Sequence, residues 1–151
     1  MSLRERFTQE MKDAMKGGDK ARLAAIRMIQ AALKDRDIEA RGAGKEVSED
    51  DILALLQKMV KSRQESLAMY EQAGREDLAA QERGEIAVIT TFLPAQMSDE
   101  DVKAAIAAAI AETGAASMKD MGKVVGALKA KFTGQMDFAK ASALVKAALN
   151  G

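Results

Sequence analysis

The 151-residue sequence contains no cysteine, no histidine and no tryptophan, and it has a single proline. Without imidazole or thiolate groups, the chain cannot build a Ser-His-Asp or Cys-His nucleophile, a zinc site of the usual ligands or a disulfide framework. Catalysis would have to depend on carboxylates, lysine, serine, threonine or the only tyrosine, Tyr70. We therefore expect no catalytic residues, no metal and no cofactor, and a chain that is not an enzyme on its own.

An excess of charge of either sign is also absent, because 23 lysines and arginines balance 23 aspartates and glutamates. This balance argues against coating nucleic acid by bulk basicity, so DNA is not an expected partner, although a local basic patch is compatible with it. The longest uniformly apolar run, residues 104–111, is far shorter than the roughly 20 residues of a membrane span. The first residues lack a signal-peptide pattern. We expect a cytoplasmic protein without a membrane partner.

Aromatic residues make up only 3% of the chain, so leucine, isoleucine, valine, methionine and alanine must form the core. These residues recur at helical spacing, and no convincing alternating β-branched run occurs, which predicts an all-α fold. We expect seven helices, each starting at a capping residue or a turn signal: Ser2, Asp19, Ser48, about Asp77, Ser98, Ser117 and near Asp137. The second helix is expected to fade through residues 35–39 into a flexible loop at 41–45.

The only proline, Pro94, marks the expected boundary between two parts of the chain. The residue before a proline is driven out of helical geometry, so a helix should end just before it. We predict a four-helix N-terminal domain over residues 1–94 and a small three-helix C-terminal domain over residues 95–151. A three-helix domain of this size is only marginally stable alone.

Three acidic clusters, at residues 35–39, 49–51 and 99–101, raise the question of a metal site. The last two clusters fall in the expected first turns of helices, where carboxylates stabilise free amides and the helix dipole. The first lacks the spacing of a calcium loop and is expected to be a solvated helix end. We therefore interpret all three as structural and predict no metal ligand among them.

The long third helix carries a row of basic residues that allows two interpretations. Lys58, Lys61 and Arg63 lie on it, and Tyr70 and Arg75 follow. Such residues are typical of a solvated face with intrahelical ion pairs. Alternatively, they form a surface that binds another protein, and the sequence leaves this alternative open.

The segment beginning at Ser117 has an unusual pattern of glycine and lysine. Apolar residues at helical spacing predict its core face: Met118, Met121, Val125, Leu128 and Phe132. The opposite side is predicted to carry what we call the lysine–glycine face: Lys119, Gly122, Lys123 and Gly126. Each glycine in a helix interior costs about 0.8–1 kcal/mol relative to alanine, so stability does not explain them.

Two explanations remain for glycines at these positions. Either this face packs closely on another helix of the same chain, or an external backbone approaches it, such as a nucleic-acid phosphate chain drawn by the lysines. Residues 115–151 carry a net charge of +4, which favours the second explanation. On charge alone, this extends the candidate site to Lys129, Lys131 and Lys140. A purely lysine set suits phosphate contacts better than base reading, and few aromatics argue against single-strand stacking.

Several stretches of the sequence together resemble the GatB/YqeY family, small helical proteins related to the C-terminal tail of the tRNA-dependent amidotransferase B subunit. The stretches that carry the resemblance are 55–63 with Glu65, Ser66 and Tyr70, then 73–78, 92–94 and, most distinctively, Ser117-Met-Lys-Asp-Met-Gly-Lys-Val125. The resemblance covers almost the whole chain and implies a two-part helical fold.

The resemblance also implies a link to the transamidation of misacylated tRNA. In the amidotransferase the tail contacts the body of the tRNA, while other domains perform the kinase and amide-transfer chemistry. The sequence resembles only the tail, so a carbon-nitrogen ligase activity with glutamine as amide donor is not expected of it alone. The resemblance implies an RNA-facing role for Lys119, Gly122 and Lys123. We expect a non-catalytic tRNA-binding module, with the amidotransferase or other translation proteins as further partners. The alternative is a protein-interaction module that uses the third helix without RNA.

Overall fold

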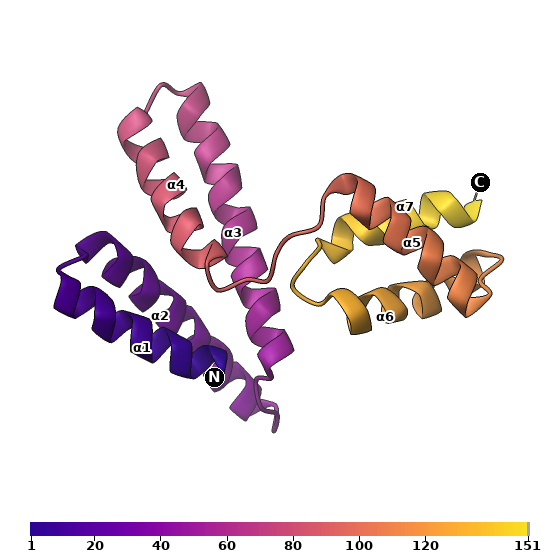
Figure 1. Cartoon of the computed structure of the whole chain (residues 1–151), viewed down its shortest axis with the longest axis horizontal. Coiled ribbons are helices and arrows are strands. Elements are labelled where there is room, and N and C mark those ends of the chain that lie inside the picture. Colours follow the sequence, from indigo (N-terminus) through magenta and orange to yellow (C-terminus); the bar gives the residue numbers. More distant parts are fainter. Residues whose placement is uncertain (151) are drawn as a thin grey trace. The chain divides into compact units, whose positions relative to one another are not determined.

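The computed structural model describes residues 1–150, and all regular secondary structure in them is helical. The all-α prediction is therefore confirmed. Seven α-helices and one 3₁₀ turn follow in order (Figure 1): α1 Leu3–Gly17, α2 Lys20–Gly42, α3 Glu49–Gln72, α4 Glu76–Thr90, α5 Asp99–Thr113, η1 Met118–Asp120, α6 Met121–Phe132 and α7 Phe138–Asn150. In this described part, no helix is long and apolar enough to cross a membrane.

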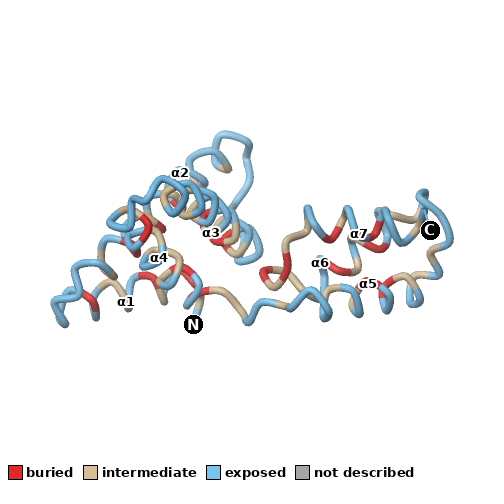
Figure 2. The backbone as a smooth tube through the Cα atoms, turned by 90° about the horizontal axis from the view of Figure 1, so that it is seen from above, coloured by how far each residue is buried: buried red, intermediate tan, exposed pale blue. Residues whose placement is uncertain are grey.

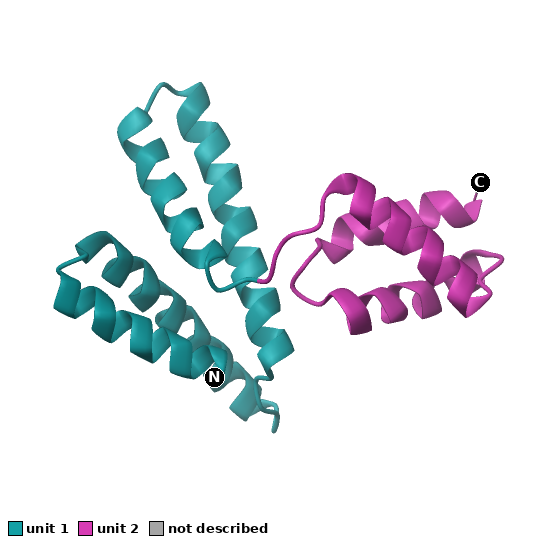
Figure 3. Ribbon diagram, viewed as in Figure 1, with its two compact units in different colours: residues 1–93 teal, residues 94–151 magenta. Residues whose placement is uncertain are grey.

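The chain divides into two compact units, residues 1–93 (unit 1) and 94–151 (unit 2), shown in different colours in Figure 3. Unit 1 holds α1 to α4. There α1 packs on α2, α3 packs on α4, and α2 also contacts α4. Unit 2 holds α5, η1, α6 and α7, with α6 in contact with both α5 and α7. Buried positions recur along the inner sides of the helices in each unit (Figure 2).

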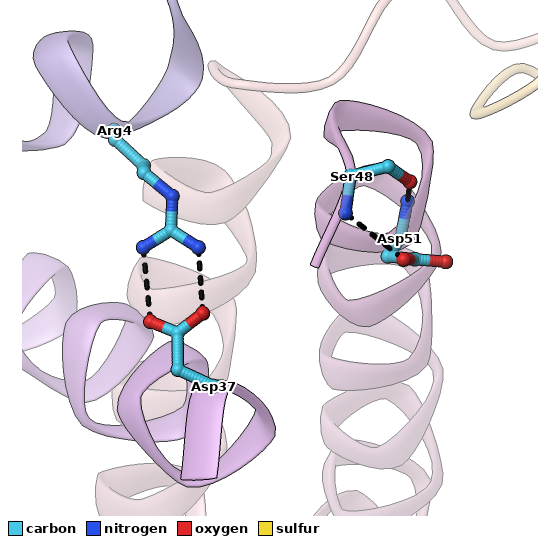
Figure 4. A network of polar contacts seen from close by, with 4 residues as sticks. All are labelled: Arg4, Asp37, Ser48 and Asp51. Carbon is cyan, nitrogen blue, oxygen red and sulfur yellow. Dashed lines mark hydrogen bonds and ion pairs between the residues drawn. The ribbon is translucent and has the colours of Figure 1, made fainter. Parts of the chain in front are cut away.

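Side-chain caps begin most of these helices where the sequence indicates. Ser48 and Asp51 form a capping box at α3: the Asp51 amide donates to Ser48 Oγ at 3.1 Å, and the Ser48 amide donates to Asp51 Oδ2 at 2.9 Å (Figure 4). Ser2 and Glu5 form the same box at α1, and Ser98 caps α5. The capping role predicted for the 49–51 cluster is thus observed at Asp51, and its hydrogen bonds to Ser48 hold the pKa of this carboxyl below its usual value.

The core of unit 1 is built around two phenylalanines from opposite ends of its sequence. Phe7 of α1 and Phe92, just after α4, are 1% and 2% exposed, and their ring centroids lie 4.8 Å apart at an interplanar angle of 77°. Arg6 stacks over the Phe92 ring and donates to the Thr91 carbonyl at 3.1 Å. The first turns of α1 therefore hold the segment that leads out of unit 1.

The second helix does not fade at residues 35–39 as predicted. It continues to Gly42, because the Arg4 guanidinium of α1 donates two hydrogen bonds, of 2.6 and 2.9 Å, to the Asp37 carboxylate of α2 (Figure 4). The chain leaves the helix through Gly44, which has a left-handed φ of 69°. The Lys45 amide donates to the carbonyl of Ala40 in the last turn at 2.7 Å. The 35–39 cluster is therefore part of a helix body that is tied to its neighbour.

Candidate nucleic-acid interface

The segment that carries the lysine–glycine face starts differently from the prediction. Ser117 makes no side-chain cap, and residues 118–120 form a 3₁₀ turn before α6 begins at Met121. The Asp120 carboxylate instead accepts the Ala116 amide at 3.0 Å, which folds the preceding loop back and holds the pKa of Asp120 below its usual value. Lys119 therefore lies in the 3₁₀ turn and only the other three residues of the face lie on α6.

The side of α6 that faces the core is also rotated relative to the prediction. Val124 and Leu128 are buried at 0% and 1% exposure, while Met121 and Val125 are half-buried. Met118, which was expected in the core, is 37% exposed. It lies in the 3₁₀ turn ahead of α6 and therefore does not follow the residue spacing of that helix. The sequence analysis expected five core residues here, and the fully buried Val124 was not among them.

The lysine–glycine face is exposed on unit 2. A side-chain Cβ built at Gly122 or Gly126 has no atom within 4 Å apart from the helix's own nearby backbone, and both residues are exposed. Close packing of these glycines on another helix is therefore absent from the described residues of this unit. Only Gly126 is in the helix interior, because Gly122 is the second residue of α6. Of the two explanations drawn from the sequence, packing of these glycines on another helix is not observed among the described residues of unit 2.

The lysines of this face are available to an anion. The Lys123 ammonium is 71% exposed and lies 3.9 Å from Asp120, at the limit of an ion pair. Lys119 is exposed, and the part of the chain that the structure describes offers it no ion-pair partner. An exposed pair as long as that of Lys123 contributes little to stability. A phosphate can therefore replace it at small cost.

The three lysines assigned on charge alone differ in their surroundings. Lys129 is exposed on α6, two residues before Lys131. Lys131 donates to Glu112 of α5 at 2.7 Å, so its charge is already neutralised within unit 2. Lys140 is exposed in the first turn of the neighbouring helix α7. Among the candidate lysines, Lys131 is already in an ion pair. We call the exposed lysines that have only a weak ion pair or none the open lysines: Lys119, Lys123, Lys129 and Lys140.

Replacing both glycines with alanine should make unit 2 more stable. Because nothing contacts the added methyl groups in unit 2, the gain is the helix-propensity difference, about 1 kcal/mol, which comes mainly from Gly126 because Gly122 lies in the first turn of α6. The measurement is urea unfolding followed by far-ultraviolet circular dichroism for wild type and Gly122→Ala/Gly126→Ala. A loss of stability would mean that these positions do pack on something in the folded chain.

Another glycine with open space around it lies in the interior of α4, where sequence reasoning did not single it out. Gly84 is exposed, and a Cβ there also has no neighbour within 4 Å. Its adjacent residues are Arg83 and Glu85, and Arg83 pairs with Glu71 and Glu76. A glycine with open space around it therefore does not by itself mark a binding site, and the lysines with weak or no ion pairs are what distinguish the lysine–glycine face.

The residues predicted for a partner surface on the third helix do not form one set. Arg63 is 17% exposed, donates to Glu85 of α4 at 3.0 Å and to the Met59 carbonyl at 3.2 Å, and so belongs to the α3–α4 contact. Arg75 pairs with Asp77 at 3.1 Å where α4 begins. Lys58 and Lys61 are exposed, and Tyr70 is half-buried. Sequence reasoning missed the role of Arg63 because Glu85 is 22 residues away along the chain.

The model of the Yqey-like protein family matches residues 4–149, nearly the whole chain. The chain belongs to the YqeY-like family. The resemblance drawn from the 55–78 and 117–125 stretches is thus confirmed as far as this family. Among residues 1–150 of this YqeY-like chain, no group of three or more acidic side chains lies close enough together to hold a metal ion.

Curated relatives of the YqeY-like chain carry the name altered inheritance of mitochondria protein 41, mitochondrial. The protein from Pyrenophora tritici-repentis is 33% identical over 88 residues, which are 58% of this chain and 46% of the relative. The protein from Vanderwaltozyma polyspora is 28% identical over 85 residues, 56% and 45% of the two chains. A Saccharomyces cerevisiae relative is 29% identical over 84 residues, 56% and 44%. The matches therefore span less than half the length of these relatives.

Proposed function

We propose that this YqeY-like chain is a non-catalytic RNA-binding module that contacts the sugar-phosphate backbone of tRNA through the lysine–glycine face. The observation that carries the proposal is that Gly122 and Gly126, which have open space around them, lie on α6 with Lys123, whose internal ion pair is weak, and directly after the 3₁₀ turn that holds Lys119. Glycine allows close approach of another backbone, and lysine supplies the charge for phosphate.

The chemistry of the face favours a folded RNA over a single strand. The chain has no tryptophan, and its only tyrosine is on α3. The two phenylalanines of α6 and α7, Phe132 and Phe138, are half-buried and pack against the core of unit 2. Bases therefore find no fully exposed ring beside the lysines to stack on. Lysine contacts phosphates as a point charge and does not read base edges bidentately. Recognition consequently depends on the shape of the RNA backbone, as in other proteins that bind folded RNA.

The proposal also covers how the chain is used. We infer that the N-terminal four-helix part and the C-terminal three-helix part act as separate domains, and that the second carries the RNA contact. The resemblance to the amidotransferase B tail supports an accessory role beside an amidotransferase or another translation protein. The carbon-nitrogen ligase chemistry then belongs to the partner, because this chain offers no histidine or cysteine.

The proposed cellular compartment depends on where the RNA partner is found. We propose the cytoplasm for this chain, while the names of its curated relatives place those proteins in mitochondria. Both compartments contain tRNA and a translation apparatus, so the relatives' names are compatible with an RNA-binding role.

Protein binding through α3 has less support than RNA binding. Arg63 and Arg75 form ion pairs within unit 1, with Glu85 and Asp77, so the predicted set does not act as one open basic surface. Met69 is 68% exposed nearby, but it is a single apolar side chain and not a patch. We therefore keep the third helix only as the alternative.

Titration of fluorescently labelled tRNA with the full chain at several salt concentrations tests the proposal. Four open lysines predict a slope of log K against log salt of roughly −3, from about 0.7 to 0.9 per phosphate contact. Polyglutamate of similar length serves as the control polyanion. Absence of tRNA binding at low salt, or equal affinity for polyglutamate, would exclude a specific RNA-binding role.

A further inference from the structure

A hollow of about 590 Å³ lies in unit 1, at the place where three segments meet. Its wall consists of Arg4 from the first turn of α1, Asp37 and Arg41 from the last turns of α2, and the loop 44–47 that leads to α3. The volume is sufficient for a small organic ligand. None of the features assigned to RNA binding lies in this hollow, because those features belong to unit 2.

The cations around the hollow are unequally used. Arg4 is fully engaged, since both of its terminal nitrogens bond to the Asp37 carboxylate and the two charges cancel. Arg41 and Lys45 are exposed, and neither has a carboxylate at ion-pair distance in the described part of the chain. Glu46 is the other carboxylate in the wall. The net charge of the lining is therefore +1. Arg41 and Lys45 interact only at longer range, with Asp37 and Asp51 respectively.

Backbone donors in the same wall are also free. The amides of Ala43, Gly44 and Lys45 donate to carbonyls in the last turns of α2, which closes that helix. The next two amides, those of Glu46 and Val47, have no acceptor among the described residues. Two charged side chains, Arg41 from α2 and Lys45 from the loop, and two successive N–H groups thus lie within residues 41–47. Such a combination is typical of sites that bind oxyanions.

We infer that this hollow binds the phosphate group of a small molecule, with the Arg41 guanidinium, the Lys45 ammonium and the Glu46 and Val47 amides as donors. A phosphate accepts hydrogen bonds from several donors at once, and two of its oxygens match the planar fork of arginine. A long polyanion such as RNA fits less well, because Glu46 lies in the wall and the acidic residues 49–51 follow directly.

The test is a nuclear magnetic resonance titration of the full ¹⁵N-labelled chain at constant ionic strength. The probes are inorganic phosphate and adenosine 5′-monophosphate, which separate free phosphate from a phosphate monoester. We expect saturable shifts centred on the amides of residues 44–47 with at least one probe. Arg41→Gln/Lys45→Gln should weaken binding roughly tenfold or more, because two charge-assisted donors are removed. All four residues involved in this variant and its control are exposed, so folding should be unaffected.

The matched control is Arg27→Gln/Lys12→Gln, which removes the same two charges from exposed sites of α2 and α1 outside the hollow. Its affinity should equal that of the wild type. The inference is overturned if neither probe causes saturable shifts at residues 44–47, or if the control weakens binding as much as the variant. Shifts of these amides with tRNA alone would also overturn it and would extend the RNA surface to unit 1.

Discussion

Phe7→Ala should destabilise unit 1 by about 3–5 kcal/mol, the cost of removing a buried phenylalanine from a core. Phe7 is 1% exposed and packs in one cluster with residues of all four helices and with Phe92. The edge-to-face contact with Phe92 adds to the loss. Because Phe92 immediately precedes the link to unit 2, the same change should loosen the end of unit 1. A loss of this size approaches the whole stability of many domains.

The measurement is urea unfolding followed by tyrosine fluorescence. Tyr70 is the only tyrosine, the chain has no tryptophan, and Tyr70 lies on α3, so this signal reports unit 1. Phe7→Leu is the control, since it keeps most of the buried volume and should lose less than half as much. A midpoint unchanged in Phe7→Ala would show that the aromatic pair does not hold unit 1 together.

Lys119→Glu/Lys123→Glu should reduce tRNA affinity at least roughly tenfold and lower the salt slope by about 1.5 to 2. Each substitution removes a phosphate contact and places a like charge beside the RNA backbone. The stability of unit 2 should change little, because the substitutions disrupt only the exposed 3.9 Å ion pair between Lys123 and Asp120. A folded variant that binds tRNA with unchanged affinity would remove the lysine–glycine face from the proposal.

The control for charge reversal is Lys12→Glu/Lys103→Glu, which alters the net charge by the same amount. Lys12 is on α1 and Lys103 on α5, and both are exposed and lie outside α6 and α7. This control should keep the affinity and the salt slope of the wild type. An equal loss in the control would mean that tRNA responds only to the overall charge of the chain.

The sequence was informative at most places where structure depends on neighbouring residues. Apolar spacing predicts the all-α fold, and the caps at Ser2, Ser48 and Ser98 are found where their local patterns indicate. These signals are reliable because a cap involves residues only three positions apart. The same reasoning failed at Ser117, because the Asp120 carboxylate bonds to the Ala116 amide and leaves a 3₁₀ turn in place of a capped α-helix.

Contacts between distant residues could not be predicted in this way. Nothing near Asp37 in the sequence indicates that Arg4, 33 residues earlier, will hold it in a helix. Arg63 likewise looks like a surface residue until α4 brings Glu85 to it. At the candidate site, the glycine and lysine spacing could be read from the sequence. Whether the glycines were bare or packed depended on the fold of unit 2 and needed the structure.

The most direct measurement of the central claim is the tRNA affinity of Gly122→Ala/Gly126→Ala, compared with Gly84→Ala. All three glycines are exposed, with open space at the added methyl groups, so each variant should remain folded and gain helix stability. If RNA approaches the α6 backbone, the double variant should bind tRNA several-fold more weakly despite its greater stability, and Gly84→Ala should bind normally. Unchanged affinity in the double variant would contradict the claim that RNA lies on this face.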